Sequence, residues 1–408
     1  MNNQPFQNPF RPGAGHPPPY LAGREKEKQE FKKLLKQTII LENLVLTGLR
    51  GVGKTVLLDT LKPISIRDSW LWVGTDVSEA VSVSEKNLAI RLITDLSSLT
   101  SNIRIAEREI RNIGFVHSTE RVENRLDYTF LVYIFENTPG LVSDKLKFVL
   151  EFVWKHVKFS NSSIKGIVLA YDEAQNLSDQ AGKDEHPLSI LLDVFQSIQK
   201  KEIPIMLVLT GLPTLFPKLV AARTFAERMF TVLTLTKLDR DSSREAINKP
   251  IDDKKSPVEF TEHGVNQIIE LSAGYPYFIQ FICREAFDLI IQTIESEKEL
   301  VVQFDGIIRK LDTDFFAGRW NKTTDRQREL LRVVSVLPNC DDEFTVQEIV
   351  EMSQMAPGKA FGNSHVNQLL KQLADAGLVY KTRFGNYSFA VPLLGQFISR
   401  LEHGRSNI

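Results

Sequence analysis

Eight consecutive residues carry the clearest chemistry in this sequence. The run from Gly48 to Thr55 is Gly-Leu-Arg-Gly-Val-Gly-Lys-Thr, which fits the phosphate-binding pattern G-x-x-x-x-G-K-[ST] at every fixed position. In such a loop the backbone N–H groups surround a β-phosphate, Lys54 neutralises β- and γ-phosphate oxygens, and the Thr55 hydroxyl ligates Mg²⁺. The sequence therefore predicts a nucleoside triphosphate site with Mg²⁺. Its expected members are Gly48, Arg50, Gly51, Val52, Gly53, Lys54, Thr55 and Val56.

An acidic pair follows a second apolar run. Residues 167–171 are apolar apart from the phenol of Tyr171, and they end in Asp172 and Glu173. At the end of a buried strand, Asp172 is expected to hold the metal, and Glu173 is expected to orient and deprotonate the attacking water. Such pairs also occur on protein surfaces, but a chain with a phosphate-binding loop favours the catalytic interpretation.

Three further side chains are candidates for contacts with the γ-phosphate. Thr210 ends the apolar run that starts at Ile205, where a hydroxyl would sense a γ-phosphate; a plain strand-ending turn is the alternative. Arg228, and as second choice Arg223, are candidates for an arginine that acts on nucleotide held by a neighbouring subunit. Such an arginine is worth about 10³ to 10⁵ in rate where it operates. A surface ion pair is the alternative for both.

Alternating strands and helices must position these groups. Apolar runs that predict strands lie at 44–47, 70–77, 167–171, 205–210 and 228–235. Continuous apolar strands indicate an α/β domain with a parallel sheet that is covered on both faces. After the loop, residues 56–61 have helical spacing that Pro63 should end, so the phosphates would lie at a helix N-terminus.

The segment between the second and third predicted strands is longer than one helical crossover needs. Residues 88–158 are expected to hold inserted helices, polar at 106–112 and apolar at 131–135 and 146–157. This insertion either enlarges the domain core or presents a surface to a protein partner.

The chain becomes helical after Lys237. Helices are expected at 239–250, 261–273, 276–294 and 303–319, then at 324–337, 345–354 and 363–376, before a β-hairpin within 378–391. These patterns give four segments. They are a proline-rich flexible arm (1–19), a P-loop nucleotide-binding core (20–236), a small all-helical domain (237–320) and a winged helix-turn-helix domain (321–408).

The balance of charge excludes a global attraction to polyanions. The 408 residues contain 50 basic and 51 acidic side chains, so any contact with nucleic acid must be local. Two cysteines suit a reducing compartment. No apolar run is long enough to span a bilayer, and the first residues lack the pattern of a secretion signal. We therefore expect a cytoplasmic protein that does not bind membranes.

The third helix of the winged domain is the candidate for DNA contact. It offers polar side chains, with two basic residues on the wing: Asn363, Ser364, His365, Asn367, Gln368, Lys371, Lys381 and Arg383. Because the domain has little net positive charge, DNA binding and packing on another protein surface remain equal alternatives.

These motifs together resemble the AAA+ ATPases of the origin-recognition-complex-like branch. Gly23-Arg24-Glu25 resembles the opening box of that branch, and the loop, the acidic pair and Thr210 resemble its two nucleotide motifs and first sensor. The resemblance covers about residues 20 to 400. It implies a five-stranded core, a helical lid, ATP as the nucleotide, and homo-oligomers in which one subunit's arginine completes the next subunit's site.

The sequence departs from that family in the lid. Where many AAA+ lids carry Gly-x-x-Arg, this chain has Gly274-Tyr275-Pro276-Tyr277, with an aromatic at the arginine position. The segment is also similar to the lid of signal-transducing switch ATPases, whose proline contacts nucleotide, so Pro276 joins the predicted ATP site and slow hydrolysis is expected. Two functions remain: ATP-dependent assembly that acts on DNA or a DNA-bound partner, or a signalling or defence switch that controls a protein-binding surface.

Overall fold

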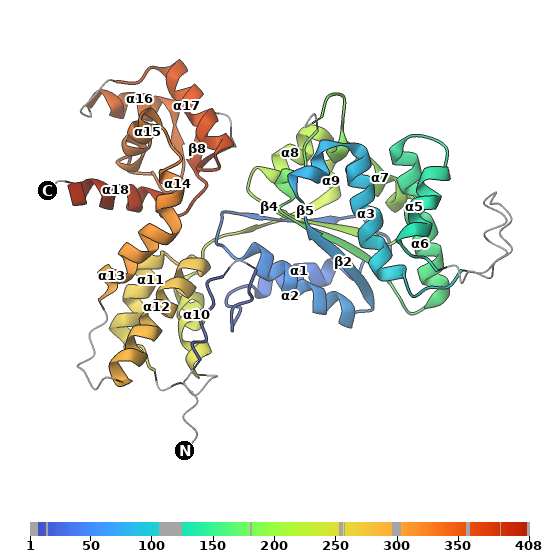
Figure 1. The fold of residues 1–408 in the computed structure, drawn as a ribbon, viewed down its shortest axis with the longest axis horizontal. Helices are drawn as coiled ribbons and strands as arrows, with labels where there is room; N and C mark the ends of the chain where they lie inside the picture. Colours follow the sequence, from blue (N-terminus) through green and yellow to red (C-terminus); the bar gives the residue numbers. More distant parts are fainter. Residues whose placement is uncertain are drawn as a thin grey trace. The chain divides into compact units, whose positions relative to one another are not determined.

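The computed structural model describes residues 7–13, 15–105, 125–179, 182–252, 256, 258–295, 303–355, 360–383 and 385–405. The chain divides into two compact units (Figure 1). The sheet unit comprises Glu25–Thr47 and Leu57–Thr234, and the lid unit comprises Met1–Arg24, Gly48–Val56 and Leu235–Ile408. Each unit is described by itself.

A five-stranded sheet forms the centre of the sheet unit. Its strands are β1 (Asn43–Gly48), β2 (Trp70–Asp76), β3 (Gly166–Asp172), β4 (Ile205–Gly211) and β5 (Phe230–Leu235). Their order is β2-β3-β4-β1-β5, and β2–β3, β3–β4 and β4–β1 pair in parallel. Every residue of β1, β3 and β4 is buried, as the continuous apolar runs predict. The expected α/β fold is confirmed.

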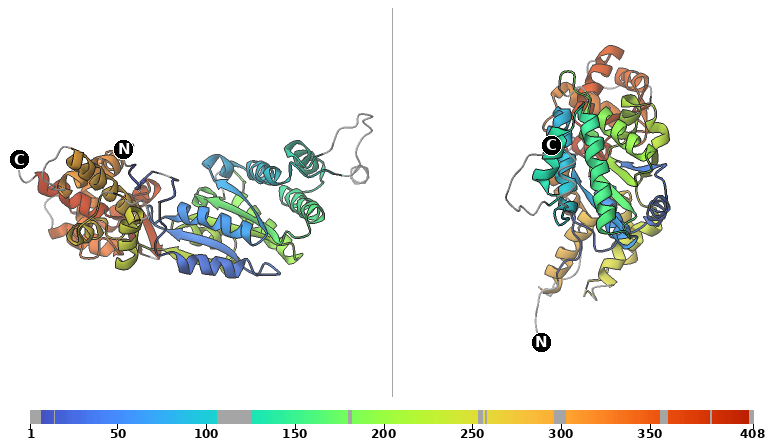
Figure 2. Two further views of the ribbon diagram at one scale, coloured as in Figure 1. Left: turned by 90° about the horizontal axis from the view of Figure 1, so that it is seen from below. Right: turned by 90° about the vertical axis from the view of Figure 1, so that its right-hand side faces the viewer.

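Helices cover both faces of this sheet (Figure 2). On one face lie α1 (Glu25–Leu34) and α2 (Lys54–Arg67). Phe31 of α1 packs edge-on against Trp72 of β2. The other face carries α3 (Glu85–Thr100), α5 (Tyr128–Asn137), α6 (Val142–Ser160), α7 (Pro187–Lys200) and α8 (Leu215–Ala222). Alternate residues of each strand therefore point to different helical layers.

The inserted helices belong to the core of the sheet unit. Buried residues of α3, α5 and α6 form one apolar cluster with alternate side chains of β3 and β4. Of the two alternatives for the insertion, this packing agrees with an enlargement of the domain core. The helix expected at 106–112 lies outside the described residues, and a 3₁₀ turn at Glu79–Val83 precedes α3.

Two boundaries differ from the sequence-based expectation. Helix α2 does not end at Pro63 but continues to Arg67. Pro63 removes only one backbone hydrogen bond, while Ile64 and Ser65 beyond it are buried and continue the packed face. Strand β5 begins at Phe230 instead of residue 228, because Arg228 belongs to the short helix α9 (Ala226–Met229).

The lid unit begins its regular structure with the predicted helices. They are α10 (Arg240–Asp252), α11 (Glu262–Ser272), α12 (Pro276–Glu295) and α13 (Phe304–Leu311), followed by a π-helical turn (Asp312–Ala317) and α14 (Gly318–Trp320). Along the described part of the chain, no helix combines the length and apolar character that a membrane span requires.

The winged helix domain is confirmed, with one extra helix. Its elements are α15 (Asp325–Ser335), β6 (Phe344–Thr345), α16 (Val346–Met355), α17 (Asn363–Asp375), β7 (Val379–Arg383), β8 (Asn386–Phe389) and α18 (Leu394–Arg405). The sequence analysis does not predict α18. Its Phe397 stacks on Phe316 with ring centroids 5.0 Å apart, and its Arg400 binds Asp312 through two hydrogen bonds. Because these contacts join α18 to the end of the lid, the boundary expected after residue 320 does not separate two compact units.

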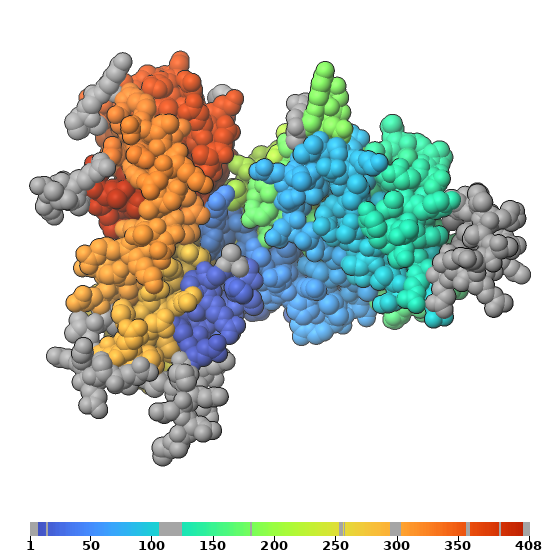
Figure 3. All heavy atoms as spheres, viewed as in Figure 1, coloured from blue at the N-terminus to red at the C-terminus, as the bar shows by residue number. Residues whose placement is uncertain are grey.

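The N-terminal arm also differs from the expectation of a flexible segment. Phe10 is only 2% exposed and packs against Phe260 and Phe287 of the lid. The Asn8 amide donates to the carbonyl of Arg284 and to Asp288 of α12. The dark-blue N-terminal residues accordingly lie on the yellow lid helices (Figure 3). Phe10 and Asn8 together thus hold this part of the arm against the lid helices.

Candidate nucleotide-binding and hydrolysis site

The phosphate-binding loop connects β1 to α2. β1 ends at Gly48 and α2 begins at Lys54, which is the strand, loop and helix order that the motif requires. Gly51 and Gly53 have φ angles of 79° and 88°, a left-handed conformation that only glycine adopts without strain. The Lys54 ammonium is 8% exposed and donates to the carbonyl oxygens of Gly48 and Leu49 at 3.0 and 2.9 Å.

Two residues of the lid unit hold this loop in place. The Arg24 guanidinium is 4% exposed and donates to the carbonyl oxygens of Val52 and Thr236 at 3.0 and 2.7 Å. The backbone N–H of Tyr277 donates to the Gly51 carbonyl at 3.1 Å. The Gly-Arg-Glu box therefore fastens the loop to the start of the lid, a role that the sequence analysis does not assign to Arg24.

Tyr277 fills the place where related lids carry an arginine. A Cβ atom on Gly51 would lie 3.1 Å from the Tyr277 Cβ, so the tyrosine and the loop are in close contact. The Tyr277 ring packs against Phe315, over which the Arg319 guanidinium lies at 4.3 Å. Burial lowers the pKa of Arg319, and the positive charge of Arg50 lowers it further. Pro276 starts α12 next to this contact, which keeps it a candidate for the nucleotide site.

In the sheet unit, the acidic pair lies at the end of β3. Asp172 is 4% exposed, and its Oδ1 accepts the backbone N–H of Glu173 at 2.8 Å. Glu173 is exposed and has φ 51° and ψ 32°, the left-handed conformation that a non-glycine residue adopts only at a cost. The Asp172 carboxylate is thus buried and oriented by its own backbone neighbour, and the Glu173 carboxylate is exposed to solvent.

Thr210 occupies the corresponding end of β4. Tyr171 of β3 pairs with Leu209 of β4, so Asp172 and Thr210 are the next residues on neighbouring strands. Thr210 is fully buried, and its hydroxyl has no hydrogen-bond partner among the described residues. A buried hydroxyl without a partner costs free energy, which a ligand oxygen could recover. This is the property expected of a phosphate sensor.

The carboxylate at the end of β2 lies near a side chain of α2. Asp76 pairs in register with Asp172, so both side chains point to the same face of the sheet. The pKa of Asp59, on α2, is raised by burial, lowered by Lys62 and raised by Asp76. The charge on Asp76 therefore acts on α2, the helix that follows the phosphate-binding loop.

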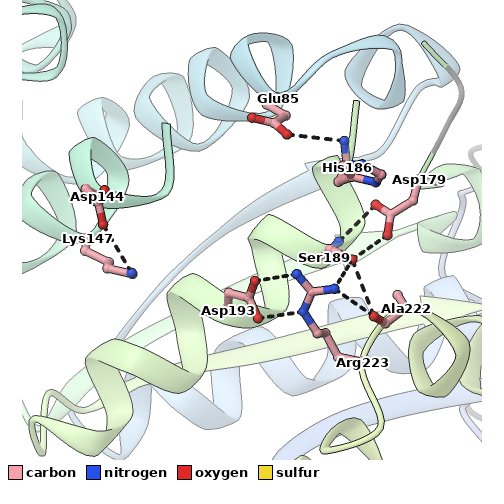
Figure 4. A network of polar contacts seen from close by, with 9 residues as sticks. All are labelled: Glu85, Asp144, Lys147, Asp179, His186, Ser189, Asp193, Ala222 and Arg223. Atoms are coloured by element: carbon pink, nitrogen blue, oxygen red, sulfur yellow. Dashed lines mark hydrogen bonds and ion pairs between the residues drawn. The ribbon is translucent and has the colours of Figure 1, made fainter. Parts of the chain in front are cut away.

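The two candidate arginines have different surroundings. Arg223 forms a bidentate pair with Asp193 at 2.8 and 2.7 Å and donates to the Ser189 hydroxyl, which also binds Asp179 (Figure 4). Hydrogen bonding to Asp193 is the main reason that the pKa of Arg223 is raised. Arg228 is exposed, and its guanidinium has no hydrogen bond or ion pair to any described residue. The Arg223 guanidinium is thus held in an ion pair within the chain, which favours the surface ion-pair alternative for this residue, and Arg228 remains a candidate.

Gln175 contacts the candidate site, and the sequence analysis does not name it. Its amide nitrogen donates to the Glu173 carboxylate, and its amide oxygen accepts from the backbone N–H of Leu212 at 3.1 Å. The only sequence signal is its position two residues after the catalytic candidate.

The polar residues proposed for DNA contact lie on the outer face of α17. The exposed side chains are Asn363, Ser364, His365, Asn367, Gln368 and Lys371. Lys381 of β7 is also exposed, while the Arg383 side chain lies outside the described side chains. Phe389 of β8 is a core residue of this domain, because it is 3% exposed and packs on Phe344.

Comparison with solved structures identifies the same architecture over nearly the whole chain. The Walker-type ATPase PABY2304 of Pyrococcus abyssi has a TM-score of 0.57 and 15% identity, covering 93% of this chain and 96% of its own. The ADP form of the Aeropyrum pernix ORC2 protein has a TM-score of 0.53 and 13% identity, with 97% of each chain covered. Its form with ADPNP and ADP has a TM-score of 0.51, 13% identity, and covers 97% of this chain and 98% of its own.

Comparisons at the level of sequence are more limited. A family model described as "Domain of unknown function (DUF8462)" matches residues 313–398, which is the end of the lid and most of the winged helix domain. A search of curated protein sequences gives no match. The sheet order, the helical lid, the winged helix and the structural neighbours agree, and the chain therefore has the fold of AAA+ ATPases of the origin-recognition-complex-like branch.

Proposed function

We propose that this protein is an ATPase that binds ATP with Mg²⁺, hydrolyses it slowly, assembles into homo-oligomers in an ATP-dependent way, and acts on DNA or a DNA-bound partner. The proposal is based on the residues that follow the neighbouring parallel strands β3, β4 and β1, at the edge of the sheet where these strands end. There, a buried Asp172, an exposed Glu173 and the unpartnered hydroxyl of Thr210 follow successive strands, and the phosphate-binding loop follows β1. These residue types suit water attack on a metal-bound triphosphate.

The types of residue at this site are those that bind Mg²⁺ and ATP. Thr55 lies in the first turn of α2 and would be one metal ligand, and Asp172 would hold the ion from β3. Bound Mg²⁺ would neutralise developing charge on the phosphates. Among the described residues no group of three or more acidic, histidine or cysteine side chains forms a metal cage, which suits an ion that takes most ligands from phosphate and water.

The remaining residues act on the substrate and on water. Glu173 takes a proton from the water whose oxygen attacks the γ-phosphorus, while the bond to the β,γ-bridging oxygen breaks and ADP leaves. Lys54 exchanges the loop carbonyls for phosphate oxygens, and Thr210 donates its hydroxyl to the γ-phosphate. Arg228 of a neighbouring subunit stabilises charge on the same phosphate. With Tyr277 in place of a lid arginine, hydrolysis is slow.

Two observations support adenine as the nucleobase of the bound nucleotide. The motif resemblance implies ATP, and the Aeropyrum pernix ORC2 protein, which shares this fold, is described in complexes with ADP and ADPNP. Titration of the protein with ATP, GTP and CTP tests the preference, and equal affinities would contradict it.

Assembly and DNA action are tested by measuring particle mass. The Glu173→Gln variant, which should retain ATP, is expected to form oligomers with ATP and not without it, and DNA should add its mass to those oligomers. Lys54→Ala, which should not bind ATP, is the matched control and should stay at its nucleotide-free mass. A Glu173→Gln particle whose mass is the same with and without ATP would overturn ATP-dependent assembly.

A protein-binding switch is the second candidate function. Helices α5 and α6 expose aromatic side chains, among them Tyr128 at 43%, Tyr133 at 39% and Phe159 at 92% exposure. Such side chains are enriched in protein interfaces. DNA binding measured against salt separates the candidates. A complex that weakens steeply with salt supports action on DNA through α17, and no complex at low salt supports the switch.

A further inference from the structure

Gln175 connects the acidic pair to the loop after β4. Its side chain lies in the 3₁₀ turn Ala174–Asn176, directly after Glu173. The Nε2 group donates to a carboxylate oxygen of Glu173, and Oε1 accepts the backbone N–H of Leu212 at 3.1 Å. All of these groups belong to the sheet unit.

The chemistry of the two partners fixes the orientation of this amide. An ionised carboxylate only accepts hydrogen bonds, and a backbone N–H only donates them. Because one end of the Gln175 side chain must donate and the other must accept, a primary amide satisfies both partners. Leucine would satisfy neither, and glutamate would face Glu173 with a second negative charge.

Glu173 depends on such support because its backbone is strained. Its left-handed conformation (φ 51°, ψ 32°) is one that L-residues other than glycine, asparagine and aspartate seldom adopt. Its N–H donates to Asp172 Oδ1 at 2.8 Å, and its carbonyl accepts the backbone N–H of Asn176 at 2.9 Å. These two bonds fix its backbone, and Gln175 provides the contact that fixes its carboxylate.

The loop on the other side of Gln175 carries the phosphate sensor. Leu212 comes two residues after Thr210, and Gly211 lies between them. A Cβ atom on Gly211 would lie 2.6 Å from Gln175 Oε1, 2.9 Å from Leu215 Cδ2 and 3.3 Å from the Gln175 backbone nitrogen, so an alanine there would displace the Gln175 amide. The Gln175 carbonyl also accepts from Lys218 Nζ of α8 at 2.7 Å.

We infer that Gln175 is a positioning residue that sets the Glu173 carboxylate according to the state of the sensor loop. When the Thr210 hydroxyl binds a γ-phosphate, any shift of the loop moves Leu212, and the Gln175 amide transmits it to Glu173. Through Lys218, α8 contacts the backbone carbonyl of the same residue, and α8 precedes the helix that holds Arg228. The inference rests on the proposed function, since it assumes that Glu173 is the base.

The test compares Gln175→Leu with Asn176→Ala. Asn176 is in the same turn, and its amide donates to the Val77 carbonyl at 2.8 Å, so its loss breaks a similar hydrogen bond away from Glu173. Gln175→Leu should lower kcat about tenfold and leave KM for ATP unchanged, the effect of losing a bond to a charged group. Asn176→Ala should keep kcat within about twofold of the wild-type value.

A variant of the same length provides a readout that a general structural defect would not give. Gln175→Glu keeps the size of the side chain but has no N–H group to donate to the Glu173 carboxylate, so it should lower kcat at unchanged KM for ATP, as Gln175→Leu does. A kcat of Gln175→Glu within about twofold of the wild-type value, or equal losses in Gln175→Leu and Asn176→Ala, would overturn the inference.

A second variant keeps the inference testable if Gln175→Leu does not fold. Gly211→Ala should displace the Gln175 amide and lower kcat in the same way, and combining it with Gln175→Ala should add little to either single loss. If the losses of kcat in the two single variants add in the double variant, Gly211 and Gln175 do not act through the same contact. If the wild-type protein has no turnover that Glu173→Gln removes, the proposed function fails instead, and the two failures are thereby distinguished.

Discussion

Replacing Thr210 by valine should make the empty protein more stable and the enzyme less active. Valine has nearly the same shape as threonine but no hydroxyl. The Thr210 side chain is fully buried, and its oxygen has no partner among the described residues, so the wild-type structure loses the hydration of that group without compensation. The cost of such a group is about 1 to 3 kcal/mol. We expect the free energy of unfolding of the sheet unit to rise by about 1 kcal/mol.

The effect on catalysis has the opposite sign. A hydrogen bond from this hydroxyl to a γ-phosphate oxygen is a bond to a charged group, worth about 1.5 to 3 kcal/mol. Thr210→Val should therefore lower kcat/KM for ATP by roughly 10- to 100-fold, since 1.4 kcal/mol corresponds to a factor of ten. Affinity for ADP should change little, because ADP has no γ-phosphate.

Urea unfolding followed by tryptophan fluorescence measures the stability. Three of the four tryptophans, Trp70, Trp72 and Trp154, lie in the sheet unit, and Trp320 lies in the lid unit. A Trp320→Phe background therefore restricts the signal to the sheet unit. Each unit needs its own transition, because a chain with two units does not have to unfold in one step.

Thr47→Val is the matched control. Thr47 is also buried with an unpartnered hydroxyl, and it lies one residue before the phosphate-binding loop. Its pairing with Gly211, one step beyond the Leu46–Thr210 pair, directs its side chain to the opposite face of the sheet. It should gain similar stability without a selective loss of ATP turnover. Lower stability in Thr210→Val, or unchanged turnover, would refute the assignment of Thr210 as a sensor.

Four further predictions concern the two arginines, the arm and the winged helix domain. Arg223→Ala should cost about 1 kcal/mol of unfolding free energy, the usual loss for a partly exposed ion pair, here to Asp193. Arg228→Ala should change stability by less than about 0.5 kcal/mol but remove turnover. Mixing it with Glu173→Gln subunits should restore activity, and no recovery would contradict a shared site. Phe10→Ala should undock the arm, since truncating a buried phenylalanine costs about 3 to 5 kcal/mol. Chymotrypsin should then cut faster after Tyr20, at the end of the arm, whereas an unchanged rate would show that Phe10 does not dock it. Burial raises the pKa of Asp341 above its ordinary value of 3.8, so the stability it contributes at low pH is lost as the pH rises through that raised pKa. Asp341→Asn should stabilise the lid unit at pH 7 and not at pH 3.5, as urea unfolding at both values would show; equal effects would exclude this origin.

Local patterns predict the sheet and the helices well because each has a strong periodic signal. The strands β1, β3 and β4 are buried along their whole length, so their sequences are continuous apolar runs and their ends are clear. Pro63 misleads in α2, since the burial of Ile64 and Ser65 outweighs the loss of one hydrogen bond. Helix α18 could not be predicted, because its place depends on contacts of Phe397 and Arg400 with residues far away in the sequence.

The site shows the same division between local and long-range information. Fixed motifs predicted the loop, Asp172, Glu173 and Thr210 as candidates, because the chemistry of phosphate binding demands those residue types. Gln175 has no such motif, and its role depends on the distance to Leu212, which only the fold determines. The choice between Arg223 and Arg228 likewise required Asp193, a residue on another helix.

The central claim is that Glu173 is the base of an ATPase. The most direct test measures equilibrium ATP binding and steady-state phosphate release for the wild-type protein and Glu173→Gln side by side. Glutamine keeps the size of the side chain and an acceptor oxygen but cannot take the proton. We predict unchanged affinity for ATP and phosphate release lowered by at least about 100-fold, in the range of general base catalysis. Phosphate release at the wild-type rate in Glu173→Gln would contradict the account.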